Sequence, residues 1–177
     1  MKARLLIVAY GNPWAGDDGV GQVIARGLRR ARLGKQVRVR HDFSDASNLA
    51  VHWRGERRIW LLDAVDWGAA PGAIRVFREE EVLALPQRHE SAHRLSLPEC
   101  LRWLRLSCPE MDRARIRLLG VQPAEIEFGA PLSPAVRRTA RRISRSLTRR
   151  LTQEGASSPR PPASQVGPQI WPGSAET

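Results

Sequence analysis

The sequence predicts a three-layer α/β sandwich, in which helices flank a mostly parallel, twisted sheet. Apolar strand-like runs alternate with amphipathic helical patterns over the first 151 residues, as in α/β domains with parallel sheets. Residues 5–9 and 59–65 are apolar runs of strand length, which indicates burial between two helical layers. With 177 residues the chain has the length of one domain. We expect that domain to span residues 1–152, and residues 153–177, rich in Ser, Pro and Gly, to form a disordered tail.

In the first half of the chain, Leu5–Ala9 is predicted as the first strand and residues 36–41 as the second. Between them a helix is expected from Asp18 to about Leu33, because its apolar residues recur at helical spacing. A short helix is expected over residues 45–53. Residues 59–65 then form a third, central strand.

In the second half, residues 73–78 alternate between apolar and basic, which is typical of an edge or hairpin strand. A brief helix over residues 79–85 precedes a second one, which opens with the capping box Ser96-Leu97-Pro98-Glu99. Residues 113–122 are the last strand, and Ser133-Pro134 begins the final helix. The buried stripe of that helix is predicted to be Val136, Ala140, Ile143, Leu147 and Leu151.

The formal charge of +11 comes almost entirely from arginine. Such a charge can attract nucleic acid or an acidic protein, or it can belong to a solvated surface. We favour the solvated surface, because no aromatic residues interleave with the basic ones as a single-strand binding platform requires. We therefore expect no nucleic-acid partner, and a monomer. Since no run is apolar enough for a membrane span, no signal peptide is evident and there are only two cysteines, we expect a cytoplasmic protein without membrane contact.

Three acid or imidazole side chains fall where an α/β sheet builds its sites. Asp18 follows the first strand, Asp63 lies near the end of the central strand, and His93 lies in a polar loop before a capped helix. The carboxyl ends of parallel strands share one sheet edge, so the two acids can converge there. Two carboxylates and one imidazole make a mixed oxygen and nitrogen site for a divalent transition metal, with open positions. We predict these three residues as catalytic and metal-contacting.

Two other interpretations remain open at this point. Residues 89–93 read His-Glu-Ser-Ala-His, the H-E-x-x-H pattern of zinc metallopeptidases. That pattern needs one continuous helix, whereas Pro86 lies upstream and Ser96 begins a separate helix, so we judge it coincidental. The other interpretation is a basic binding module without catalysis, whose binding would weaken steeply with salt.

Four segments, in order, resemble the hydrogenase maturation proteases. They are Gly11-Asn12-Pro13 with Asp17-Asp18-Gly19-Val20-Gly21, Leu61-Leu62-Asp63-Ala64-Val65-Asp66 with Pro71-Gly72, Ser91-Ala92-His93-Arg94-Leu95, and Gly120-Val121-Gln122-Pro123 with Leu132-Ser133-Pro134. The resemblance implies an endopeptidase that trims the carboxyl-terminal extension from the large-subunit precursor of a nickel–iron hydrogenase. The nickel would arrive in that precursor.

The resemblance also implies roles for single residues. Asp18, Asp63 and His93 match the positions that contact nickel in this family, and Asp17 would support these ligands or cap the helix. One segment departs from the family: Asp42-Phe43-Ser44-Asp45 stands where many relatives have Asp-x-Gly-Thr, a segment associated with substrate choice. Trp14 and Trp67, in loops beside the predicted crevice, either contact the substrate or pack the loops.

Overall fold

The computed structural model describes residues 4–31, 33–43, 46–85 and 96–156. Its sheet has five strands in the order β2-β1-β3-β5-β4. The strands are β1 (Leu5–Ala9), β2 (Val37–His41), β3 (Arg58–Ala64), β4 (Ile74–Arg78) and β5 (Arg115–Val121). Only β4 among these is antiparallel to its neighbour, and it lies at an edge. This confirms the mostly parallel sheet, the central third strand and the predicted edge strand.

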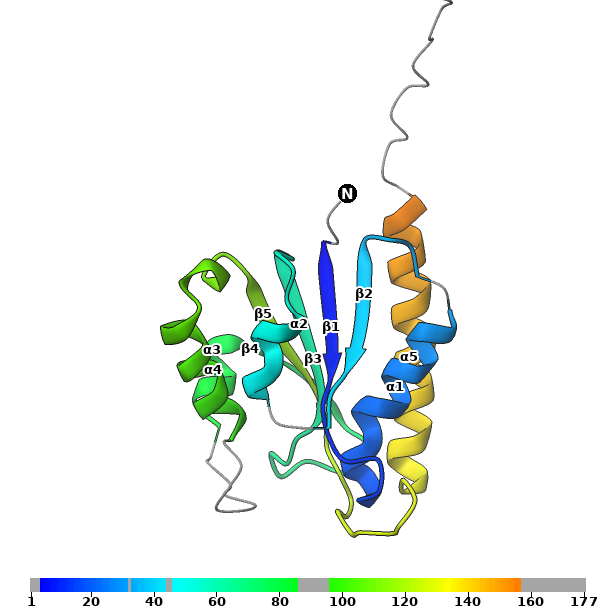
Figure 1. Cartoon of the computed structure of the whole chain (residues 1–177). Coiled ribbons are helices and arrows are strands. Elements are labelled where there is room, and N and C mark those ends of the chain that lie inside the picture. Colours follow the sequence, from blue (N-terminus) through cyan, green and yellow to red (C-terminus); the bar gives the residue numbers. More distant parts are fainter. Residues whose placement is uncertain (1–3, 32, 44–45, 86–95, 157–177) are drawn as a thin grey trace, which may run out of the picture.

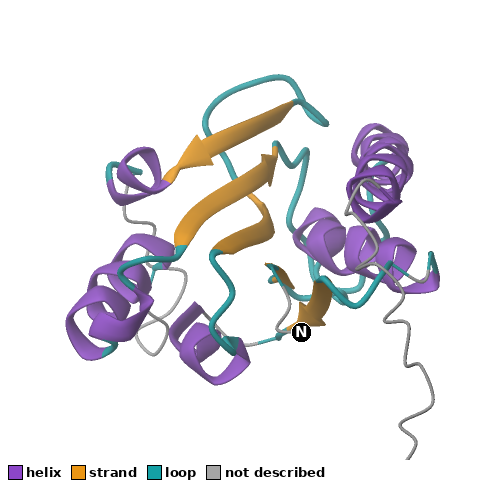
Figure 2. Cartoon of the chain, turned by 90° about the horizontal axis from the view of Figure 1, so that it is seen from above, coloured by secondary structure: helices purple, strands orange, loops and turns teal. Residues whose placement is uncertain are grey.

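Helices cover both faces of the sheet, which gives the predicted three layers (Figures 1 and 2). Helices α1 (Val20–Arg30) and α5 (Pro134–Ala156) lie on one face. Helices α2 (Leu49–His52), α3 (Glu79–Leu83) and α4 (Leu97–Ser107) lie on the other. The alternation of β1 explains this division, because successive strand residues point to opposite faces: Leu5 and Ile7 pack with α1 and α5, and Leu6 and Val8 with α2 and α4.

Helix α5 buries the whole predicted stripe, Val136, Ala140, Ile143, Leu147 and Leu151. Its arginines cover the remaining, more exposed positions. The helix continues to Ala156, four residues beyond the expected domain boundary at 152. None of the described helices is both long and apolar enough to cross a membrane.

The first helix differs most from its prediction. A 3-10 turn, Gly16–Gly19, precedes α1, which begins at Val20 and ends at Arg30 rather than Leu33. Gly16 has φ of +56°, a left-handed conformation that glycine adopts without the steric cost of a side chain. The two adjacent acids therefore lie in a tight turn before α1, and their side chains point to different partners.

Two contacts set the direction of α3 and α4. Arg105, near the end of α4, forms an ion pair with Glu79 at the start of α3, with Nη2 and Oε2 2.6 Å apart. Arg102 donates to the backbone oxygen of Leu83 at the end of α3, at 2.7 Å. The helices therefore run antiparallel. Arg105 also reaches Ala114, just before β5, so the start of α4 at Leu97 faces the carboxyl edge of the parallel strands.

Candidate active site

The loop after β1 folds back onto the turn that carries Asp18. Gly11 has φ of +99°, and a Cβ there would lie 2.0 Å from the backbone oxygen of Asp18. The backbone N–H of Asn12 donates to the Asp18 carboxylate at 2.6 Å. Gln22 on α1 is buried, and its side-chain amide donates to the backbone oxygens of Ala9, at 3.3 Å, and Gly11, at 3.2 Å. Asp18 is thus held, partly buried, at the carboxyl end of β1.

Asp63 is the second-last residue of β3 and lies opposite Gly120 of β5. Its carboxylate accepts a hydrogen bond from the N–H of Ala64 at 2.9 Å, and it is partly buried. Because Ile59 and Leu61 pack on the α4 side, alternation places Asp63 on that same face.

A close backbone contact joins the ends of β1 and β3. A Cβ at Gly21 would lie 2.5 Å from the backbone oxygen of Leu62 and 2.7 Å from that of Tyr10. The start of α1 therefore packs against the residue that precedes Asp63. Asp18 and Asp63 consequently lie at the same edge of the sheet, as parallel strands require.

His93 lies outside the described residues, as do His89 and Glu90 of the H-E-x-x-H pattern. Among the described residues, no three His, Cys, Asp or Glu side chains form a group that could hold a metal ion. The meeting of His93 with Asp18 and Asp63 therefore stays a prediction.

Asp17 has a role that the sequence did not indicate. It is only 1% exposed. Its Oδ1 accepts the N–H of Ser133 at 2.7 Å, and its Oδ2 accepts those of Ala124 at 2.8 Å and Glu125 at 3.4 Å. The residue at the start of α1 is Gly19, without a side-chain cap, so the expected helix cap is wrong. Asp17 instead ties the loop between β5 and α5 to the turn before α1, over more than 100 positions in the chain.

An imidazole–carboxylate pair lies beyond the end of β2. His52 Nε2 and the Asp42 Oδ2 atom are 2.7 Å apart, and the Gln22 amide donates to the backbone oxygen of Asp42 at 3.0 Å. Gln22 therefore links the first loop to the segment that departs from the family pattern. His52 belongs to no sequence motif that could have identified it. Its partner Asp42 could be noticed in the sequence, because it begins the segment that departs from the family pattern.

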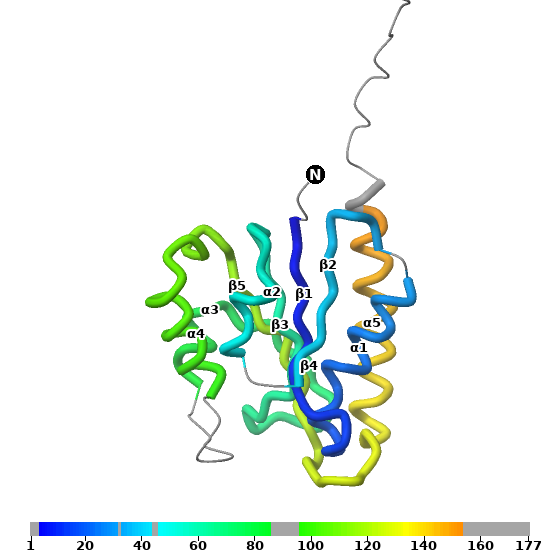
Figure 3. Tube along the Cα trace, in the orientation of Figure 1, coloured from blue at the N-terminus to red at the C-terminus, as the bar shows by residue number. Residues whose placement is uncertain are grey.

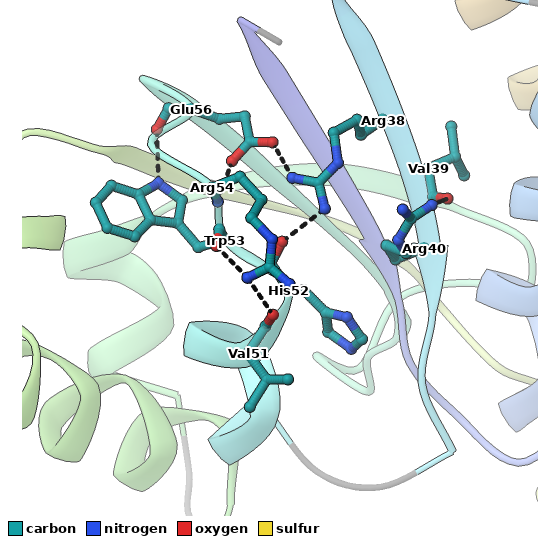
Figure 4. A network of polar contacts seen from close by, with 8 residues as sticks. All are labelled: Arg38, Val39, Arg40, Val51, His52, Trp53, Arg54 and Glu56. Atoms are coloured by element: carbon teal, nitrogen blue, oxygen red, sulfur yellow. Dashed lines mark hydrogen bonds and ion pairs between the residues drawn. The ribbon is translucent and has the colours of Figure 1, made fainter. Parts of the chain in front are cut away.

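A second polar network fixes the turn between α2 and β3 to β2 (Figure 4). The buried Glu56 accepts from the Arg38 guanidinium and from the N–H of Arg54, at 2.7 Å for the latter. Arg38 also donates to the backbone oxygen of His52 at 2.9 Å. This network holds the His52 backbone in place.

Trp14 and Trp67 are expected either to contact the substrate or to pack the loops, and the structure distinguishes the two residues. Trp67 is partly buried, packs against the α4-side core and contacts Phe77 edge to face, with ring centroids 5.6 Å apart. Trp14 is 70% exposed. Packing thus explains Trp67 and leaves Trp14 available to a partner.

A groove of about 300 Å³ lies away from these acids, between β4 and α5. Trp60 and Ile74 line it. Trp60 and Asp63, three positions apart on β3, point to opposite faces. The groove therefore does not belong to the candidate site.

Comparison with known proteins gives a consistent result. The family model of the hydrogenase maturation protease HycI matches residues 27–150. The hydrogenase expression/formation protein HupM of Azotobacter chroococcum is 34% identical over 139 residues, covering 76% of this chain and 65% of that protein. The chain thus spans about two thirds of the length of several curated relatives. Protein FrxA of Pyrococcus furiosus is 32% identical over 70% of this chain and 87% of its own.

Solved structures agree. The hydrogenase maturating endopeptidase HybD of Escherichia coli superposes with a TM-score of 0.69 at 25% identity, covering 86% of this chain and 94% of that one. HybD of Thermococcus kodakarensis has a TM-score of 0.65 at 27% identity, with 84% and 99% covered. These similarities support neither the zinc metallopeptidase nor the non-catalytic binding module. With the family model covering more than half of its length, the chain belongs to the hydrogenase maturation protease family.

Proposed function

We propose that this protein is an endopeptidase that removes the carboxyl-terminal extension from the large-subunit precursor of a nickel–iron hydrogenase, after nickel has been inserted. One observation supports it beyond family membership: Asp18 and Asp63, on segments 45 positions apart, lie at the same edge of the sheet. We further propose that the reaction takes place in the cytoplasm, as the sequence led us to expect.

In this proposal the nickel belongs to the substrate. Asp18, Asp63 and His93 contact it with two carboxylates and one imidazole, donor types that suit a divalent transition metal. Three protein ligands leave coordination positions for the precursor's own groups. The metal supplies polarisation of the scissile carbonyl or of a water molecule.

The residues of this chain perform the positioning. The Asn12 amide holds the Asp18 carboxylate in one orientation, and that amide is itself placed by the close contact of Gly11 with Asp18. Such an anchored carboxylate need not reorganise when the charged substrate arrives. Because the three residues contact the precursor through its nickel, a precursor without nickel should not be cleaved.

The test compares cleavage of nickel-loaded and nickel-free precursor from the same genome by wild type and four variants. We expect Asp18→Asn, Asp63→Asn and His93→Ala to lower cleavage by more than the roughly 10–100-fold that loss of an outer-shell partner of a metal ligand costs. The control His89→Ala should keep it. Loss in both His89→Ala and His93→Ala, with cleavage retained in Asp18→Asn and Asp63→Asn, would favour the zinc metallopeptidase instead. Equal cleavage of both precursors would refute nickel selectivity.

A further inference from the structure

Three large apolar side chains are exposed on the two loops beside Asp18. Trp14 is 70% exposed, Ile126 49% and Phe128 79%. Single exposed apolar residues are ordinary, but a group of them on neighbouring loops is typical of a binding surface. We call these three side chains, the aromatic Trp14 and Phe128 with the aliphatic Ile126, the aromatic platform.

The loops that carry the platform lie side by side (Figure 3), and backbone hydrogen bonds join them. The N–H of Gly129 donates to the oxygen of Trp14 at 2.7 Å, and that of Gly16 donates to Ala130 at 3.2 Å. A Cβ at Gly16 would lie 3.1 Å from the backbone oxygen of Glu125. The buried Asp17 carboxylate adds three hydrogen bonds from the backbone amides of the second loop. A platform held in this way pays little ordering entropy when a partner binds.

The platform borders the candidate active site. Asp17, which fastens the second loop, directly precedes Asp18, and the chain reaches Trp14 only two residues after Asn12, whose amide holds Asp18. Trp14 and Asp18 therefore belong to one short segment, which the contacts of Asn12 with both residues hold together.

The charge beside the platform is opposite in sign to the net charge of the molecule. The chain carries +11 in total, yet Glu125 and Glu127 flank Ile126 and are exposed. Neither side chain has an ion-pair or hydrogen-bond partner in the part of the chain that the structure describes. These two acids favour a basic partner segment and steer its approach.

We infer that the aromatic platform docks the hydrogenase precursor through an apolar segment flanked by basic residues, next to the metal-bearing part of that precursor. The inference rests on the proposed function for the identity of the partner. Docking is separate from nickel recognition, so the platform contributes equally to binding precursor with and without nickel.

The test measures the dissociation constant for nickel-free precursor, which the enzyme is not expected to cleave, by a titration that requires no catalysis. Trp14→Ala and Phe128→Ala should each raise Kd by about tenfold or more, as truncation of an aromatic anchor does. The matched control is Leu106→Ala, because Leu106 is 83% exposed but lies on α4; it should leave Kd within about twofold. Thermal melts of all variants check that the surface changes leave the fold intact.

The double variant Glu125→Gln/Glu127→Gln tests the charge. Its Kd should exceed that of wild type at low ionic strength, and the difference should shrink as salt is raised. Equal Kd values for wild type, Trp14→Ala and Phe128→Ala, or an equal change in Leu106→Ala, would overturn the inference. So would a salt-independent effect of the acid pair or the absence of measurable binding by wild type. Failure of the proposed function appears elsewhere, as absence of cleavage of the nickel-loaded precursor by wild type.

Discussion

Asp17 and Asp18 are adjacent acids with different roles, stability for Asp17 and the proposed catalysis for Asp18, and substitution by asparagine separates these roles. The Asp17 carboxylate accepts three backbone amides in a nearly inaccessible position. Asparagine keeps the shape but replaces one oxygen with an NH₂ group, which then faces a backbone N–H. At least one charge-assisted hydrogen bond, about 1.5–3 kcal/mol, is lost. The hydrogen bonds that remain are weaker, because their acceptor is then a neutral amide oxygen in place of a carboxylate.

We therefore expect Asp17→Asn to lower the free energy of unfolding by about 2–4 kcal/mol, a large share of the usual 5–15 kcal/mol of a domain. Urea denaturation measures this as a shift of the midpoint by roughly 1–2 M with an unchanged slope. Hydrogen exchange should show faster opening at Ala124 and Ser133, whose amides lose their acceptor.

The matched comparison is Asp18→Asn, which should abolish cleavage with the smaller loss of stability, because Asp18 is less buried. A loss below about 1 kcal/mol in Asp17→Asn, with Ala124 and Ser133 still protected, would refute the reasoning that this carboxylate fastens the loop.

Three further changes have expected outcomes. Gly21→Ala places a Cβ 2.5 Å from a backbone oxygen, so chemical denaturation should show an unfolding free energy lower by about 3 kcal/mol or more. The control Gly34→Ala should change that free energy little, because its Cβ meets nothing closer than 3.9 Å. Equal effects of the two variants would contradict the close approach of α1 to β3. Arg38→Met leaves the buried Glu56 carboxylate without its cation and should lower the free energy of unfolding by about 1–3 kcal/mol. The loss is smaller than for a fully buried ion pair because Arg38 is partly exposed. In a double-mutant cycle, Arg38→Met/Glu56→Gln should recover part of the lost stability. The backbone amide of Arg78, just before α3, donates to Glu81 and lowers the pKa of that carboxyl from its ordinary 4.5. Glu81 therefore stabilises the fold above pH 4.5 and loses that effect as pH falls through the lowered pKa. Glu81→Gln should be less stable than wild type at pH 7, the difference in unfolding free energy should vanish in acid, and a difference that does not change with pH would refute this.

The sequence predicted those elements whose signals are local. The β1 run, the alternation of β4, the Ser96 capping box and the α5 stripe each have a short-range pattern, and the structure confirms all four. The first helix was predicted too long because the turn that carries two acids resembles a helix start, while the left-handed Gly16 and the three amides bound by Asp17 come from tertiary contacts.

The candidate site divides in the same way. Asp18 and Asp63 could be placed at one sheet edge because strand polarity alone determines where parallel strands end. The His52–Asp42 pair could not be predicted, because its partners lie on separate elements whose placement depends on tertiary contacts such as those of Gln22 and the Glu56 network. Trp14 and Trp67 look alike in sequence; only the packing of Trp67 against Phe77 distinguishes them.

The central claim is that Asp18, Asp63 and His93 share the nickel of the precursor, and the nickel X-ray absorption spectrum of a mixture frozen before cleavage tests it most directly. We predict that mixing nickel-loaded precursor with wild type adds oxygen and nitrogen ligands, including the outer-shell scattering of an imidazole. That imidazole signal should be absent with His93→Ala. An unchanged nickel spectrum in a mixture that goes on to cleave would contradict the account.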